Sequence, residues 1–249
     1  MYRIGVAGVC GKMGKRIAHF LIEDDKANFS ACFEVEGHPD IGKDLGEVLG
    51  SEKMGIEVTS GIDSIVDKVD CIIDFTLPVG TFSHVAKCKE KRVAIVIGTT
   101  GIDEKGEEKI KEAAETIPVV FSPNMAIGVN LFFNIIKEVA RVFGKNSEIT
   151  IDETHHVHKK DSPSGTAKRI AKVVKEVTDE TPKIEAFREG EVIGNHGIVF
   201  DGQFETIEIR HDAKTRDVFA NGAIKAALYL EGKKTGFYDM RDVLGLKKD

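Results

Sequence analysis

Several features that would point to other classes of protein are missing from this 249-residue chain. No apolar run approaches the roughly 18–20 residues that a helix needs to cross a bilayer, so we expect no membrane segment. The N-terminus has no cleavable signal pattern, because residues 2–7 already have the apolar pattern of a strand. The net charge of −6 argues against nonspecific binding of nucleic acid, so any basic site has to be local.

Paired cysteines are also missing. The chain has four cysteines and no CxxC motif, and each cysteine lies in an apolar or periodic segment. We therefore expect reduced, structural thiols and a cytoplasmic protein. The four cysteines are Cys10, Cys32, Cys71 and Cys88. The chain also shows no internal repeats and no low-complexity linker.

In the first half of the chain, short β-branched runs alternate with helical patterns. The predicted strands cover residues 2–9, 29–35, 71–75, 93–97 and 118–121, and the predicted helices cover 12–23, 80–91 and 104–116. Strands and helices that alternate at this spacing indicate βαβ units and a parallel sheet. The strands are continuously apolar, as expected when helices cover both faces of an α/β sheet.

The pattern changes after residue 124. We predict an amphipathic helix at 126–143, a half-buried strand at 148–154, a helix at 166–177, a strand at 204–210 and a helix at 218–231. These are features of an α+β domain with a mainly antiparallel sheet that is open on one face. The predicted buried face of the first of these helices consists of Val129, Phe132, Phe133, Ile136, Val139 and Ala140.

A glycine loop joins the first predicted strand to the first predicted helix. Gly8, Gly11 and Gly14 have a GxxGxxG spacing, which permits a sharp turn and a close approach to a pyrophosphate at a helix N-terminus. Glu34 ends the second predicted strand, where an acid can accept hydrogen bonds from the adenosine ribose, and Lys12 adds a cation. The loop predicts a dinucleotide site, with a purely structural turn as the alternative.

Two later strand ends fit the same cofactor. The segment 74–76 (Asp-Phe-Thr) ends one predicted strand, and the segment 98–101 (Gly-Thr-Thr-Gly) ends the next. Ligands of open α/β sheets bind beyond the carboxyl ends of the strands. Gly98 offers a close backbone there, and Thr99 and Thr100 offer two hydroxyls. Thr and Gly are also ordinary turn residues, so a plain turn is the alternative.

The segment 153–166, ETHHVHKKDSPSGT, holds three of the eight histidines within four positions. A preceding strand would deliver His155 and His156 to a strand end, where a rigid support suits catalytic groups. Histidine exchanges protons near neutral pH, and Lys159 supplies charge and a second proton donor. Ser164 is a predicted N-cap, and the free N–H groups after it can bind a carboxylate. The segment predicts a site where a small anion is held and protonated.

Three other interpretations of this segment stay open. A metal site would use the histidines, but the chain has no HExxH motif and no nearby cysteine pair, and the lysines would repel a cation, so we expect no metal. A solvated loop with chance histidines is the second. A basic docking patch for nucleic acid or membrane is the third, although interleaved aromatic residues are missing.

The segment 153–167 resembles the E-x-H-H-x-x-K-x-D-x-P-S-G-T-A signature of the bacterial 4-hydroxy-tetrahydrodipicolinate reductase (dihydrodipicolinate reductase) family. Segments 8–14, 74–76, 98–101, 219–223 and 239–244 resemble earlier and later blocks of that family in the same order. The resemblance implies a Rossmann-like dinucleotide-binding domain, 1–125 plus 217–249, and a substrate-binding and tetramerisation domain, 126–216. It implies an NAD(P)H-dependent reductase of the diaminopimelate route to lysine, working as a homotetramer on a small dicarboxylate.

The resemblance also implies roles for individual residues. His155 would be the proton donor or acceptor and Lys159 a proton donor. The substrate carboxylates would be held by His156, Gly165 and Thr166, with Ser164 and Lys160 as weaker candidates; His158 is expected only to support the loop. The cofactor contacts would come from Gly8, Val9, Cys10, Gly11, Lys12, Met13, Glu34, Gly98, Thr99, Thr100, Ser122, Pro123, Asn124 and Met125.

Two positions bear on the choice of cofactor. Members that use NADPH well commonly carry an arginine after the acid of the second strand, where this chain has Val35, and a second basic residue where it has Leu77. Without them a 2′-phosphate has few partners and Glu34 repels it, so NADH is predicted to be preferred, although Lys12 or Lys15 could rescue some NADPH binding. A non-catalytic sensor of the NADH/NAD ratio is the alternative function.

Overall fold

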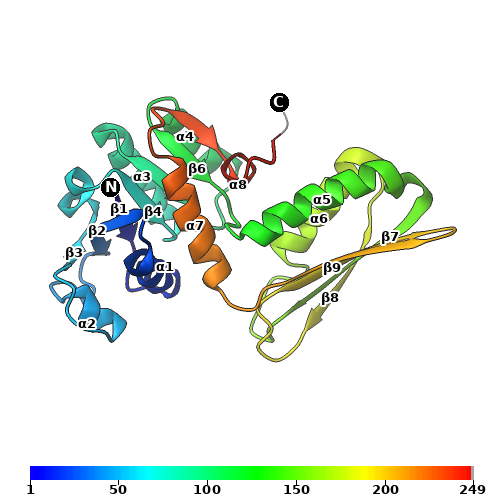
Figure 1. Ribbon diagram of the computed structural model, residues 1–249, viewed down its shortest axis with the longest axis horizontal. Coiled ribbons are helices and arrows are strands. Elements are labelled where there is room, and N and C mark those ends of the chain that lie inside the picture. Colours follow the sequence, from blue (N-terminus) through cyan, green and yellow to red (C-terminus); the bar gives the residue numbers. More distant parts are fainter. Residues whose placement is uncertain (248–249) are drawn as a thin grey trace. The chain divides into compact units, whose positions relative to one another are not determined.

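The computed structural model describes residues 1–247 and divides into two compact units. One unit contains Met1–Met125 together with the segment from Phe219 onward, and the other is Ala126–Val218 (Figure 1). Within residues 1–247, no helix is both long enough and apolar enough to span a bilayer.

The first unit is built on a seven-stranded sheet with the order β11-β6-β5-β4-β1-β2-β3. Every neighbouring pair of strands runs parallel. The strands are β1 (Tyr2–Ala7), β2 (Ala27–Glu34), β3 (Val58–Ser60), β4 (Cys71–Asp74), β5 (Ala94–Ile97), β6 (Pro118–Phe121) and β11 (Gly236–Tyr238). The helices are α1 (Lys12–Glu23), α2 (Leu45–Leu49), α3 (Pro78–Lys91), α4 (Glu104–Ala114), α7 (Asp217–Tyr229) and α8 (Met240–Val243).

Both faces of this sheet are covered. Ile95 belongs to a core cluster with Val85 of α3 and Ile110 of α4. Its neighbour Val96 is equally inaccessible yet points to the opposite face, because successive side chains of a strand alternate. The helix α1 contacts β1 and β2 and contributes nothing to the α3–α4 cluster, so it lies on that second face. The predicted parallel sheet with helices on both faces is confirmed.

The second unit contains a four-stranded sheet with the order β10-β9-β7-β8. The strand β9 runs antiparallel to β7 and β10, and only β8 runs parallel to β7. The helices α5 and α6 cover one face through a shared core that includes Phe132, Ile136, Ile170, Ile151 and Phe200. This confirms the mainly antiparallel sheet. The elements are β7 (Ser147–His155), β8 (Lys183–Arg188), β9 (Asn195–Gly202), β10 (Thr206–Asp212), α5 (Ile127–Phe143) and α6 (Gly165–Thr178).

The structure adds β3, β8, β9, β11, α2 and α8, which the sequence patterns did not predict. The strands β3 and β11 have three residues each, too few for a periodic pattern. The predicted strand at 204–210 begins instead at Thr206, because the Gly202 N–H donates to the Glu205 carbonyl and closes the hairpin turn between β9 and β10.

Candidate active site

The glycine loop makes a tight connection between β1 and α1. Gly8 has a φ of 65°, in the left-handed region that favours glycine, and its N–H donates to the Phe33 carbonyl at 3.0 Å. A Cβ on Gly14 would overlap the Gly8 carbonyl oxygen, so α1 can pack this closely only with glycine there. Gly11 is the N-cap of α1 and offers no side-chain cap, which leaves the first N–H groups of the helix for an anion.

This loop lies where the order of the strands reverses. From β1 the chain adds β2 and β3 on one side, and β4, β5 and β6 follow on the other. The carboxyl ends of β1 and β4 therefore border the crevice in which open α/β sheets bind ligands. The two strand ends are close together, since a Cβ on Gly8 would lie 2.9 Å from the methyl group of Thr76.

Glu34 anchors the second strand end to the glycine loop. The side chain is buried, and its carboxylate accepts hydrogen bonds from the Cys10 N–H at 3.0 Å and the Val35 N–H at 3.1 Å. Desolvation, followed by the charge of Glu34, raises the pKa of Cys10 to about 11, so its thiol stays protonated. A fixed negative charge thus lies beside the loop, while the Val35 and Leu77 side chains are exposed and apolar.

The ends of β4 and β5 are tied together by buried hydroxyls and one carboxylate. Asp74 is fully buried and accepts hydrogen bonds from the Thr76 N–H and hydroxyl, both at 2.7 Å, and its other oxygen lies 2.8 Å from His84 Nδ1. The Thr99 hydroxyl lies 2.7 Å from that of Thr81, which is also buried. Contrary to the prediction of two available hydroxyls, Thr99 is buried and its hydroxyl is hydrogen-bonded to Thr81. The exposed Thr100 keeps its hydroxyl at the surface.

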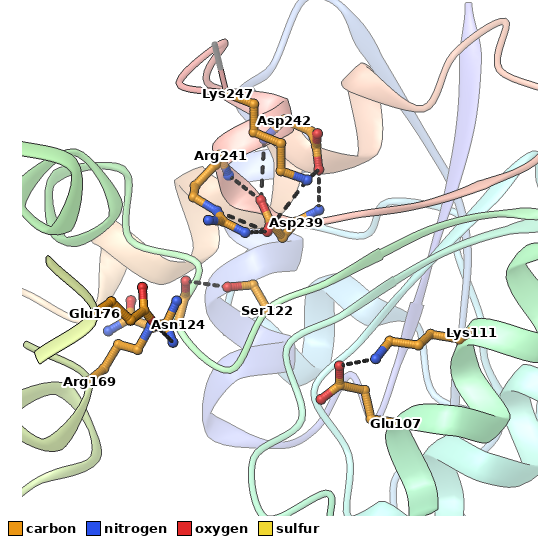
Figure 2. Close-up of polar contacts among 10 residues, drawn as sticks. All are labelled: Glu107, Lys111, Ser122, Asn124, Arg169, Glu176, Asp239, Arg241, Asp242 and Lys247. Carbon is orange, nitrogen blue, oxygen red and sulfur yellow. Dashed lines mark hydrogen bonds and ion pairs between the residues drawn. The ribbon is translucent and has the colours of Figure 1, made fainter. Parts of the chain in front are cut away.

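The segment after β6 is also largely committed to the fold. The Ser122 hydroxyl donates to the Asn124 carbonyl at 2.8 Å (Figure 2). The Met125 side chain is buried, and a Cβ on Gly222 of α7 would overlap its carbonyl oxygen. In this segment, then, a cofactor would meet backbone, the exposed Pro123 and the half-buried Asn124.

The block 239–244 acts as a helix cap. Asp239 accepts hydrogen bonds from the Arg241 and Asp242 N–H groups, and the Asp242 carboxylate accepts the Asp239 N–H at 2.7 Å. Figure 2 shows Arg241 and Lys247 paired with these carboxylates. The block therefore fixes the start of α8, and its charges are used within the fold.

In the second unit, β7 ends at His155, whose ring contacts a buried carboxylate. Glu153, two residues earlier on the same face of the strand, is fully buried and is hydrogen-bonded to His155 Nδ1. The same carboxylate accepts the Ser164 N–H at 3.0 Å and two N–H groups of Arg188, each at 3.1 Å. Neither Glu153 nor Arg188 was given a role from the sequence; the position of Glu153 two residues before His155 was the available signal.

The pKa values of this cluster follow from burial and charge. Desolvation lowers the pKa of His155 and outweighs the opposing effect of Glu153, which favours the neutral ring. Burial by itself would raise the pKa of Glu153, but hydrogen bonds from Arg188, His155 and Ser164 outweigh it, and this pKa is lowered. Desolvation lowers the pKa of His196, which packs edge-to-face on His155 at 5.1 Å, to about 3.

The other predicted residues of the segment divide by exposure. His156 Nδ1 is buried and has no hydrogen-bond partner among residues 1–247, which suits a ligand contact. Lys159 is partly buried, and its ammonium lies 2.8 Å from Asp161. His158 is exposed and lies 3.4 Å from Glu191 at the surface, and Lys160 is exposed too.

The start of α6 combines a side-chain cap with an unobstructed glycine. The Ser164 hydroxyl caps the helix by accepting the Ala167 N–H at 3.1 Å, as predicted, and lies 3.3 Å from His196 Nε2. Ser164 is buried, and its hydroxyl is thus used within the fold. A Cβ on Gly165 would meet nothing within 4 Å, so the fold itself does not require glycine there.

Two groups of three metal-type donors occur in the described part of the chain. They are Glu153, His155 and His196, and Cys10, His38 and Asp40. In the first group Arg188 already neutralises Glu153. In the second, Lys43 pairs with Asp40 at 2.5 Å, and the Asp40 N–H donates to His38 Nδ1. We assign a metal to neither group.

Family models and named relatives match this chain over nearly its full length. The family model for the N-terminus of dihydrodipicolinate reductase matches residues 2–125, and the model for its C-terminus matches residues 128–244. A 4-hydroxy-tetrahydrodipicolinate reductase of Geotalea daltonii is 38% identical over 267 residues, covering 99% of this chain and 100% of the relative. One of Dechloromonas aromatica is 40% identical over 265 residues, covering 98% of each chain.

Solved structures agree. The dipicolinate-bound dihydrodipicolinate reductase of Paenisporosarcina sp. TG-14 superposes with a TM-score of 0.83 at 25% identity, covering 97% of this chain and 99% of that one. A probable dehydrogenase of Thermotoga maritima shares the fold alone, with a TM-score of 0.66 at 12% identity, covering 98% of this chain and 93% of that one.

The Rossmann-type sheet, the family models and the named relatives define an NAD(P)-dependent oxidoreductase, as predicted. More specifically, the chain belongs to the dihydrodipicolinate reductase family, which confirms the resemblance seen in residues 153–167.

Proposed function

We propose that this protein reduces 4-hydroxy-tetrahydrodipicolinate to tetrahydrodipicolinate with NAD(P)H, in the diaminopimelate route to lysine. The observation that carries the proposal is the arrangement at the end of β7. There His155 is hydrogen-bonded to the buried Glu153, and Lys159 and the start of α6 lie close to His155. The dipicolinate bound to the relative from Paenisporosarcina supports a small dicarboxylate as the substrate.

In this proposal the residues of the second unit bind the substrate and supply the proton. The cofactor, when bound at the glycine loop, supplies a hydride; the substrate also gains a proton, and its hydroxyl leaves as water. The N–H groups of Gly165 and Thr166 and the unpartnered Nδ1 of His156 would hold the carboxylates. A bound dianion would favour the protonated form of His155, and Lys159 would stabilise the developing negative charge.

Replacing Lys159 tests the function. We expect Lys159→Ala to lower kcat about 10²–10⁴-fold, because a proton donor and a cation are lost, while the affinity for NADH stays unchanged. The measurement is NADH oxidation with freshly made substrate, together with NADH titration in the absence of substrate. Lys175→Ala, which removes an exposed lysine in the last turn of α6, is the control and should keep normal turnover. Near-normal turnover by Lys159→Ala would contradict the assignment, and NADH binding by a wild-type protein without turnover would favour a sensor.

We also propose that NADH is preferred over NADPH. The carboxylate of Glu34 is fixed beside the glycine loop, and the exposed side chains of Val35 and Leu77 offer a 2′-phosphate no charge. Comparing kcat/KM for the two cofactors tests this preference. The double variant Val35→Arg/Leu77→Arg should raise kcat/KM for NADPH at least about tenfold, whereas Val142→Arg, exposed on α5, should not. A strong NADPH preference in the wild type would refute the proposal.

We propose finally that the protein is a cytoplasmic homotetramer that joins through the second unit. The face of its four-stranded sheet opposite α5 and α6 is partly exposed along β10, and Phe187 and Phe204 are exposed large apolar residues of this unit. Light scattering on the purified protein would show a single dimer or monomer if this proposal is wrong.

A further inference from the structure

The two oxygens of the Glu153 carboxylate have different partners. Oε1 accepts three hydrogen bonds: one from the Ser164 N–H at 3.0 Å and two from Arg188 at 3.1 Å. Oε2 has a single partner in the described part of the chain, the Nδ1 of His155. The side chain is fully buried.

This arrangement decides which nitrogen of His155 carries the hydrogen. A carboxylate that is ionised can only accept, so the neutral ring must place its hydrogen on Nδ1. The lowered pKa of Glu153, explained by Arg188 and the other donors, keeps the carboxylate ionised. The other charged or titratable groups around the ring are Lys159, Asp161, Arg188 and His196. The carboxylate among them, that of Asp161, pairs with Lys159. None of these groups therefore competes with Glu153 as the acceptor for the Nδ1 hydrogen.

The other nitrogen, Nε2, is left open by a glycine. A Cβ on Gly194 would lie 3.0 Å from Nε2, tight enough to crowd the lone pair. The hydrogen bond described for this ring is made by Nδ1. Beside it His196 presents its ring at 75° to that of His155.

We propose that Glu153 is a positioning residue that fixes His155 as the Nδ1–H tautomer, so that Nε2 exchanges the proton with the substrate. The catalytic meaning rests on the proposed function, whereas the tautomer is a property of the chain by itself. The same carboxylate binds the Ser164 N–H. It therefore also fixes the position of the His155 ring relative to the start of α6, where the N–H groups of Gly165 and Thr166 are proposed to bind a substrate carboxylate.

The variant Glu153→Gln replaces one of the two carboxylate oxygens by an NH₂ group and so tests which of them His155 requires. Three donors already point at the Oε1 position, so the amide oxygen of the introduced glutamine takes that place and its NH₂ group faces Nδ1. Nδ1 must then accept, and the ring hydrogen moves to Nε2. We expect ¹⁵N NMR of the histidine rings at neutral pH to show this exchange of protonated nitrogens at His155. We also expect kcat to fall about 100-fold or more, with the KM for NADH unchanged.

Asp152→Asn is the matched control. Asp152 precedes Glu153 on β7, points to the other face and pairs with Arg210 at 3.0 Å, so its amide should change neither the tautomer nor kcat. Glu153→Asp keeps the charge and should restore the Nδ1–H tautomer and part of the lost kcat.

The outcomes are distinguishable. A His155 that keeps its hydrogen on Nδ1 in Glu153→Gln would overturn the inference. If that variant does not fold, the wild-type spectrum decides, because a neutral His155 with its hydrogen on Nε2 overturns it equally. A wild type with the Nδ1–H tautomer but no turnover of 4-hydroxy-tetrahydrodipicolinate would reject the proposed function and leave the tautomer assignment standing.

Discussion

At the scale of single residues, the second unit holds a base that the fold keeps neutral. His196 lies on β9, buried beside His155 and 3.3 Å from the Ser164 hydroxyl. Its pKa of about 3 lies well below the ordinary value of 6.5, because burial and then the neighbouring His155 disfavour the charged ring. The unfolded chain takes up this proton near pH 6.5, whereas the folded chain does not, so acid favours unfolding through His196.

This difference predicts a pH-dependent stability. The contribution of a neutral His196 is fully present above about pH 6.5 and is lost as the pH falls toward about 3. Urea unfolding of the wild type should therefore show a free energy of unfolding that decreases from about pH 7 to about pH 4.5 more steeply than that of His196→Gln. The lowered pKa values of Glu153 and Asp161 act in the same direction in both proteins, so the difference between the slopes is the measure. Equal slopes would contradict the prediction.

The candidate reacting side chains could be proposed from the sequence, whereas the groups that support them could not. His155 and Lys159 follow from residue type and spacing, and a run of residues with proton-exchanging groups needs no tertiary information to be noticed. Glu153 was visible in the same motif, but its role depends on Arg188, which is 35 positions away along the chain and reaches it only because β8 pairs with β7. The prediction that the Thr99 hydroxyl is available failed for the same reason, since its hydrogen-bond partner Thr81 lies 18 positions away on α3.

At the scale of elements, two glycines at helices should respond oppositely to the same substitution. In Gly222→Ala the new Cβ on α7 would overlap the Met125 carbonyl, which is backbone and cannot rotate away. We expect a loss of about 1–3 kcal/mol in the free energy of unfolding, more than the gain in helix propensity of about 1 kcal/mol. Thermal unfolding measures the effect.

Gly165→Ala is the counterpart at the start of α6. Nothing lies within 4 Å of its Cβ, so the stability should be unchanged or slightly higher, while the KM for the dicarboxylate rises because the methyl group obstructs the helix start. A loss of stability in Gly165→Ala as large as that in Gly222→Ala would show that the room around the new methyl group does not control the outcome.

The strongly periodic helices and the continuously apolar strands were predicted, whereas the three-residue strands and the strands without clean alternation were not. The helix α1 has the predicted bounds of residues 12–23, because its apolar residues recur with one period between a glycine and the next strand. The strands β8 and β9 show no clean alternation of buried and exposed residues. Their pairing comes from contacts with β7 and β10, which a local pattern does not contain.

At the scale of the whole molecule, the second unit should fold by itself. Its sheet, its two long helices and their shared core all lie within Ala126–Val218. We expect residues 126–218, expressed alone, to unfold cooperatively, and residues 1–125 alone to lack a cooperative transition, because β11 and most of α7 are missing. Circular dichroism during heating measures both; a cooperative transition in residues 1–125 would contradict the prediction.

The return of the last segment to the first sheet has a consequence for synthesis. The strand β11 pairs with β6, yet more than a hundred residues are translated between them. At about 5–20 residues per second the ribosome leaves the edge of β6 unpaired for several seconds, during which the inserted unit can already have formed. During that interval the nascent chain therefore contains both a folded second unit and an unpaired edge at β6. A chaperone that binds exposed strands could bind this edge until β11 is made.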